Sequence, residues 1–220
     1  TPIKSSATSD VYKRQISRTA AFSRQMSLFF KCYINDILSG RFESKPALAV
    51  TVVYSGGDDV FLLGAWNDVV EAALRIRQAF TAFSCGALTI SAGLALVDDH
   101  YPVRLSAAAS GDLEDLAKQE PDKDAVCLFE SAHCYGWNTF TGRVLGEKKA
   151  ALEAFFGARG QERGTAFLYR TLDLLRTAQD PKDGKLQLAR YAYLLARLEP
   201  PRTSPAFGAY RTFADKMYRW

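Results

Sequence analysis

Six consecutive residues, Tyr54 to Asp59, form the most chemically informative stretch of this 220-residue chain. They read Tyr-Ser-Gly-Gly-Asp-Asp, with one apolar run before them (47–53) and another after them (60–63). Two short apolar runs separated by glycines predict a β-hairpin, with two carboxylates at its tip. Glycine tolerates positive φ and presents no side chain, so a phosphate can approach the tip closely. Neighbouring carboxylates beside phosphates suit Mg²⁺ or Mn²⁺.

The two carboxylates, Asp58 and Asp59, also have a plainer interpretation, because Gly and Asp are common in solvated turns. The flanking runs argue against it, since they are almost continuously apolar and therefore predict buried strands. Neighbouring side chains on a regular strand point to opposite faces. We therefore expect Asp58 to be the better metal ligand and Asp59 to serve a second ion or hold the turn. Such a hairpin is typical of palm domains that polymerise or cyclise nucleotides.

Composition narrows the remaining classes of protein. Apolar residues make up 48% of the chain and charged residues 24%, as in ordinary globular proteins. A net charge of +4 is too weak to predict nucleic-acid binding by itself. No apolar run is long enough for a membrane span, so we expect no membrane partner and a cytoplasmic location. The four cysteines contain no C-x-x-C pair and predict reduced thiols, and a zinc site at His133-Cys134 lacks a second ligand pair.

Hydrophobic periodicity predicts the elements that hold the hairpin. A helix is expected over 16–39, from apolar residues at helical spacing: Phe22, Met26, Phe29, Tyr33 and Ile37. Further helices are expected over 66–83 and 102–118, and strands over 88–96 and 125–129. The strand 88–96 has one face of small residues, which is typical of a strand beneath a closely packed helix or beside a ligand. Together these elements predict an α/β ferredoxin-like palm of the nucleotide cyclase or polymerase type over residues 16–146.

From residue 147 onward the pattern is purely helical. Apolar residues recur at 3.6-residue spacing over 147–156, 165–177, 185–198 and 206–218, between turns rich in Gly and Pro. We predict a small all-α helical bundle over residues 147–220, with this core: Leu168, Leu172, Leu175, Leu188, Tyr191 and Leu195. Residues 1–15 match no targeting peptide and resemble translated adapter sequence. We therefore set them aside as an aberrant or disordered segment.

With these segments placed, the chain resembles the C-terminal part of the large palm-domain (GGDD) subunit of type III-A CRISPR–Cas interference complexes. The resemblance covers roughly residues 16–220 and rests on these runs: Ser17 to Phe30, Val52 to Leu63, Thr89 to Ala95 and Phe167 to Arg170. The hairpin alone is shared with GGDEF-type diguanylate cyclases. The surrounding runs are much more specific to the CRISPR subunit.

The resemblance implies an antiviral nucleotidyltransferase that makes cyclic oligoadenylates from ATP when its complex holds a matching target RNA. It implies that Asp58 and Asp59 are the catalytic metal ligands for Mg²⁺ or Mn²⁺. The nucleotide-binding residues that it implies are Ser55, Gly56, Gly57 and Lys118. The implied partners are ATP, a guide RNA, a target RNA and other subunits of the effector complex, including a small helical subunit.

One feature of the family is missing here. The family takes another metal-binding carboxylate from an Asp-x-Asp-type strand upstream of the first helix, whereas Asp10-Val11-Tyr12 has no second acid. We therefore expect a palm that lacks its first strand and is inactive alone. Two alternatives stay open: a catalytically silent scaffold that docks RNA and small helical subunits, and a diguanylate-cyclase-like enzyme. The intact acidic pair counts against the first. Asp59, where the cyclases have Glu-Phe, and the appended bundle count against the second.

Overall fold

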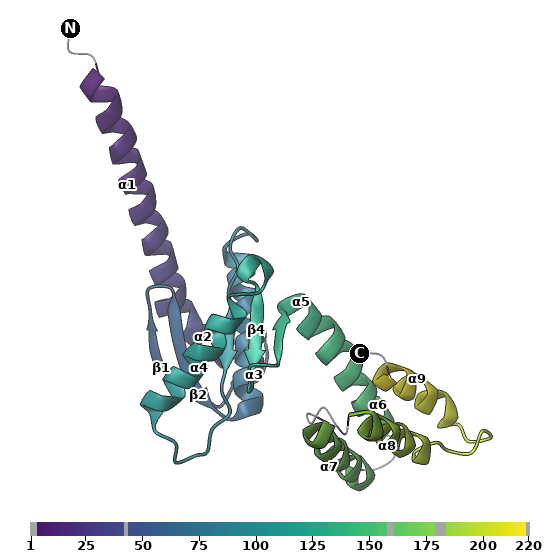
Figure 1. The fold of residues 1–220 in the computed structure, drawn as a ribbon. Coiled ribbons are helices and arrows are strands. Elements are labelled where there is room, and N and C mark those ends of the chain that lie inside the picture. The colour runs from purple at the N-terminus through teal and green to yellow at the C-terminus, as the bar shows by residue number, and fades with distance from the viewer. Residues whose placement is uncertain (1–3, 42–43, 158–160, 179–183, 219–220) are drawn as a thin grey trace. The chain divides into compact units, whose positions relative to one another are not determined.

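A computed structural model describes residues 4–41, 44–157, 161–178 and 184–218 (Figure 1). Contacts divide the chain into two compact units, Thr1–Trp137 and Asn138–Trp220. Each unit is described separately below. Among the described residues, no helix combines the length and apolar character that crossing a bilayer requires.

The first unit mixes helices with two small sheets. Its elements are α1 (Lys4–Leu28), a π-helical turn (Phe29–Tyr33), α2 (Ile34–Ser39), β1 (Val50–Gly56), β2 (Asp59–Gly64), α3 (Trp66–Phe83), β3 (Ala92–Leu94), α4 (Val103–Ala117), β4 (Ala125–Leu128) and β5 (Cys134–Gly136). Strands β1 and β2 form an antiparallel pair. Strand β4 lies between β3, to which it is parallel, and β5, to which it is antiparallel. Helix α1 begins at Lys4 rather than at Ile16, so it includes most of residues 1–15, which were expected to be aberrant or disordered.

The main core of this unit joins the first helices to α3 and to one face of the hairpin. Its buried members are Met26, Phe29, Phe30, Ile34, Leu38, Ala72, Ile76 and Phe80. The Phe29 ring lies 5.2 Å from both the Phe30 and the Phe80 ring, centroid to centroid. Alternate residues of the hairpin pack onto this cluster: Val50, Val52, Val60 and Leu62. The core therefore fixes which face of the hairpin meets the helices.

The apolar stripe predicted for the first helix is only partly right. Met26 and Phe29 are buried, but 52% of Phe22 and 37% of Tyr33 is exposed. A π-helical turn holds one more residue than an α-helical turn, so it rotates everything that follows it. Beyond the turn, Ile34 is buried in place of the predicted Tyr33.

The predicted strand 88–96 is regular only at β3. Before β3, the hydroxyls of Thr89 and Ser91 donate to the carbonyls of Asp122 and Lys123, each at 2.8 Å. Gly93 lies directly beneath α4, where an added Cβ would stand 2.1 Å from the carbonyl oxygen of Ser110. The small face of this strand therefore lies under a closely packed helix, which is the first of the two arrangements that its pattern indicated.

The expectation of reduced thiols throughout is wrong for one pair of cysteines. The register of β4 and β5 sets Cys127 opposite Cys134, with a Cα–Cα distance of 4.0 Å, and a disulfide joins them. Cys32 and Cys85 are free and exposed. The pairing follows from strand register rather than from a spacing motif, so no cysteine pattern in the sequence predicts it.

The second unit contains helices and turns, with no strand among its described residues. The chain enters it through α5 (Trp137–Thr139), and then come a π-helical segment (Phe140–Lys149), α6 (Ala150–Gly157), α7 (Gln161–Ala178), α8 (Gly184–Arg197) and α9 (Phe207–Tyr218). Aromatic side chains dominate its core: Phe155, Phe156, Phe167, Leu195, Tyr210, Phe213, Ala214 and Met217. The rings of Phe155 and Phe213 are stacked, with centroids 4.6 Å apart.

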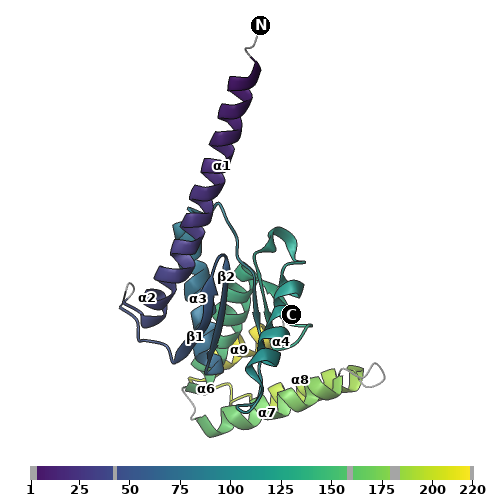
Figure 2. The same cartoon turned by 90° about the vertical axis from the view of Figure 1, so that its left-hand side faces the viewer.

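The predicted core of the bundle is largely wrong. Leu195 is fully buried and Tyr191 packs beside it, but Leu168, Leu172 and Leu188 are 44%, 49% and 67% exposed. The side chain of Leu175 lies outside the described part of the chain. Phe167 faces the core, and Leu168 and Leu172 lie roughly 100–140° around the helix from it. Helices α7 and α8 lie side by side (Figure 2). Leu168 and Leu172 of α7 and Leu188 of α8 nevertheless remain exposed on the surface of this pair.

We expect Gly93→Ala to destabilise the first unit by at least about 1–3 kcal/mol, because the added methyl group meets the backbone of α4. The matched control is Gly111→Ala in the same helix, where an added Cβ meets nothing within 4 Å. That control should gain up to about 1 kcal/mol from helix propensity. Urea unfolding measures both changes, and equal midpoints for the two variants would contradict the close packing of α4.

In the second unit, Phe213→Ala should cost about 3–5 kcal/mol, since it empties the centre of the aromatic core. Leu168→Ala removes an exposed side chain and should cost less than about 1 kcal/mol. Thermal unfolding of the two variants compares these costs. A larger loss of stability for Leu168→Ala would show that Leu168 is a core residue, as its helical spacing predicted.

Candidate functional site

The acidic hairpin closes with a two-residue loop. Gly56 at the end of β1 pairs with Asp59 at the start of β2, which leaves Gly57 and Asp58 between them. Gly57 has φ +68°, as the first loop residue of a type II′ turn requires. Its added Cβ would meet nothing within 4 Å, so the space above the loop is open. Because Gly56 has no side chain, the carboxylate of Asp59 has no side chain directly across from it.

A β-bulge in β1 decides which face Tyr54, Ser55 and Gly56 take. Val52 lies opposite Leu62 and Tyr54 lies opposite Phe61, so β1 holds one residue more than β2 at this point. Bulges reverse the alternation of side chains beyond them. Ser55 then lies opposite Val60, which packs against the helical core. Gly56 and Asp59 form the next pair, so Asp59 takes the face away from the helices.

Both carboxylates are available to a ligand. Asp58 and Asp59 are exposed, and neither carboxylate forms a hydrogen bond or ion pair with any described residue. Uncommitted, hard oxygen donors fit Mg²⁺ or Mn²⁺, and the open loop leaves room for the phosphates that complete such sites. Nowhere in the described ranges do three or more His, Cys, Asp or Glu side chains gather to hold a metal ion. The described part of the site therefore supplies at most two protein ligands.

Lys118 was also expected to bind nucleotide. It caps the C-terminal end of α4 and donates to Glu114 at 2.8 Å, with Asp115 at 3.9 Å. The hydrogen bond to Glu114, together with the charges of Glu114, Asp115 and Asp59, raises the pKa of Lys118, and partial burial opposes the rise. Asp59 makes the smallest of these contributions, and the ion pairs of Lys118 are with Glu114 and Asp115.

Ser55 points in another direction. Its hydroxyl donates to the backbone carbonyl of Phe30 in the π-helical turn, on the helix side of the hairpin. In Figures 1 and 2 the hairpin tip lies beside the C-terminal end of α1, in keeping with this bond. Ser55 was expected to bind nucleotide, but its hydroxyl is bonded to the protein backbone instead.

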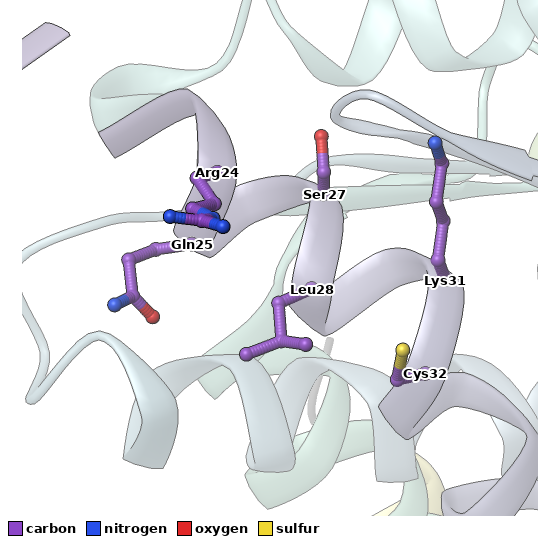
Figure 3. A pocket seen from close by; sticks show the side chains of 6 residues that line it. All are labelled: Arg24, Gln25, Ser27, Leu28, Lys31 and Cys32. Atoms are coloured by element: carbon purple, nitrogen blue, oxygen red, sulfur yellow. The ribbon is translucent and has the colours of Figure 1, made fainter. Parts of the chain in front are cut away.

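A groove of about 390 Å³ on the same helical segment was not recognised from the sequence. Figure 3 shows the side chains that line it: Arg24, Gln25, Ser27, Leu28, Lys31 and Cys32. Ser27 and Lys31 point to one side in this view and Leu28 points to the other. The sequence pattern that could have indicated this groove is the seven-residue interval between Arg24 and Lys31, which puts two positive charges on one side of a helix.

Comparison with known families divides the chain in the same way as the fold. The model for "Cas10/Cmr2, second palm domain" matches residues 3–127. The model for "CRISPR RNA silencing complex Cmr2 subunit, second helical domain" matches residues 153–220. A palm followed by a helical domain was the predicted fold class, and it is confirmed.

Curated relatives are described as "CRISPR system single-strand-specific deoxyribonuclease Cas10/Csm1 (subtype III-A)". The one from Mycobacterium tuberculosis is 40% identical over 213 residues, which cover 93% of this chain and 25% of that protein. The one from Enterococcus italicus is 44% identical over 184 residues, covering 84% of this chain and 22% of that protein. The chain thus spans about a quarter of the length of these relatives.

Solved structures agree with these matches. Csm1 of T. onnurineus superimposes with a TM-score of 0.63 at 29% identity, covering 84% of this chain and 29% of that one. A Csm1–Csm4 cassette in complex with cA4 gives a TM-score of 0.59 at 25% identity, covering 89% of this chain and 32% of that one. Palm, helical domain and relatives all lead to one assignment: the chain belongs to the Cas10/Cmr2 family of CRISPR subunits, in which its relatives are Cas10/Csm1 proteins of subtype III-A.

Proposed function

We propose that this chain is the part of a type III-A CRISPR subunit that makes cyclic oligoadenylates from ATP. The observation that supports it is the exposed acidic pair Asp58 and Asp59 on an open glycine loop, with no partner among the described residues. A silent palm has no need for two uncommitted carboxylates at this position. The proposal makes the full-length subunit a nucleotidyltransferase, with this hairpin as its catalytic site.

In this proposal Asp58 and Asp59 hold Mg²⁺ or Mn²⁺. Such an ion would neutralise charge on the attacked α-phosphate and favour the attacking form of a ribose 3′-hydroxyl. The chain itself holds the two carboxylates outward on a short loop. Gly57 admits the nucleotide backbone because the space at its Cβ position is open. Gly56 is buried, and a Cβ added there would stand 3.3 Å from the Tyr54 hydroxyl, so its proposed role is to shape the turn. Lys118, whose pKa is raised mainly by its hydrogen bond to Glu114 and least by the charge of Asp59, is the candidate partner for a nucleotide phosphate.

The ligands of the solved relatives support ATP as the substrate. Csm1–Csm4 cassettes have been solved with one ATP, with pppApApA and with cA4. These ligands are a substrate, a linear oligoadenylate and a cyclic one, in the order that stepwise synthesis would give. By extension we propose ATP, guide RNA, target RNA and the other effector subunits, a small helical one included, as partners of this chain in the cytoplasm.

The alternatives remain distinguishable. A diguanylate-cyclase-like enzyme would convert GTP rather than ATP. A silent scaffold would convert neither nucleotide, yet would still join the complex. Labelled ATP and labelled GTP, each supplied to the full-length subunit with and without the assembled complex and target RNA, separate these three functions.

Replacing Asp58 and Asp59 together with Asn should lower ATP conversion by the assembled full-length subunit by at least about 100-fold, since both metal ligands are weakened. Folding should be unaffected, because the exposed pair holds no other residue and its removal relieves like-charge repulsion. The assay measures labelled oligoadenylates, with circular dichroism as the check on folding.

A matched control for this variant exists in the same unit. Asp98 and Asp99 are also adjacent and exposed, with only His100 nearby at 3.8 Å from Asp99. Asp98→Asn with Asp99→Asn should leave ATP conversion within about twofold of wild type. Wild-type rates in the Asp58/Asp59 variant would remove the hairpin from the catalytic site.

We further propose that an opposing carboxylate and a neighbouring strand come from a part of the subunit outside these 220 residues. Among the described strands, β2 pairs only with β1, and β3 pairs only with β4, so each has an edge open to another strand. This chain alone should therefore bind Mn²⁺ weakly and form no oligoadenylate. Manganese titration and labelled ATP measure both properties beside the full-length subunit. Robust turnover by the short chain would show that two carboxylates are enough.

A further inference from the structure

The hydrogen bond from the Ser55 hydroxyl to the Phe30 carbonyl connects the acidic hairpin to the first helix. Ser55 reaches this carbonyl only because of the bulge at Val53. Without the extra residue, Ser55 would share a face with Thr51 and Val53, which are both exposed. The bulge places it instead in the half-buried layer between hairpin and helices.

The acceptor is unusual as well. Phe30 lies in the π-helical turn Phe29–Tyr33, which interrupts the regular ladder of i→i+4 bonds. The Phe30 side chain is only 2% exposed, so its backbone is held within the core. The Phe30 ring packs against Phe29 and Phe80 at centroid distances of 5.2 and 5.9 Å. The carbonyl therefore projects from a fixed platform toward the hairpin.

Ser55, the donor, directly precedes the glycine loop that carries the two carboxylates. Gly56 and Gly57 follow Ser55 directly and allow the backbone more conformations than any other residue type would. No described hydrogen bond or ion pair holds the side chains of Asp58 and Asp59. Ser55 lies opposite Val60, and on β1 its hydroxyl is the last side-chain contact with the helical layer before the loop.

We propose that Ser55 is a positioning residue, which holds the acidic tip at a fixed place over the π-helical turn, and that it does not bind nucleotide. The structural part of this proposal stands on the hydrogen bond and the bulge. Its catalytic consequence rests on the proposed function, because only a working site can lose rate when its carboxylates are misplaced. A tip that is free to move would still bind ATP but would seldom align both carboxylates.

The test compares Ser55→Ala with Ser55→Thr, which keeps the hydroxyl, in the full-length subunit. Thr51→Ala is the matched control, since it removes an exposed hydroxyl from the same strand. Hydrogen exchange of peptides over the hairpin and the π-helical turn is measured first. Ser55→Ala should exchange about fivefold faster in both peptides, the factor expected from one lost hydrogen bond, with no change in α4. Ser55→Thr and Thr51→Ala should exchange like the wild type.

Kinetics with ATP then separate positioning from binding. Ser55→Ala should lower kcat about tenfold or more and leave KM for ATP within about twofold, whereas Ser55→Thr should regain most of the rate. A raised KM with unchanged hairpin exchange would overturn the proposal and make Ser55 a nucleotide contact. If the wild-type subunit makes no oligoadenylate, the proposed function fails, but hydrogen exchange still decides whether Ser55 holds the tip. Unchanged exchange in Ser55→Ala would refute that role.

Discussion

The packing of Phe29 and Phe30 against Phe80 is the interaction on which the candidate site depends. These three rings join the first helix to α3 and support the inner face of the hairpin. Buried aromatic pairs of this kind add specific geometry to the burial of apolar area. Because Phe29 and Phe30 lie in the π-helical turn that follows α1, the same contact also fixes the backbone carbonyl that receives the Ser55 hydroxyl. Core and site therefore share one platform.

The hairpin illustrates how local irregularities can serve a site. A regular strand would put Tyr54 rather than Ser55 against the helices, because Val50 and Val52 of the same strand already face them. The single bulge at Val53 prevents this. Asp59 takes the outer face for a different reason, since β2 alternates regularly and Val60 and Leu62 face the helices. The bulge and the π-helical turn each insert one residue, and both insertions lie next to the glycine loop. Irregular elements of these two kinds are often found beside functional sites.

The two units differ in what their surfaces offer. In the first unit, polar function is concentrated at one open loop with uncommitted carboxylates. In the second unit, the core is aromatic, and α7 and α8 leave large apolar side chains exposed, with Leu188 and Tyr193 at 67% and 64%. The chain spans about a quarter of its curated relatives, so further parts of such subunits lie outside it. Two different family models match the two units: the palm model matches residues 3–127, which hold the acidic loop, and the helical-domain model matches residues 153–220, which hold the aromatic core.

The sequence by itself determined the features that depend on neighbouring residues. Apolar runs around Gly56 and Gly57 predicted the hairpin, the alternation about Gly93 predicted a strand beneath a helix, and the quoted runs predicted the family. What depends on distant residues was decided only by the tertiary structure. The side to which Ser55 points follows from a bulge, the pairing of Cys127 with Cys134 follows from strand register, and the exposure of Leu168 follows from the aromatic residues of α6 and α9. Periodicity shows that a face is apolar, but only packing decides which apolar face is buried.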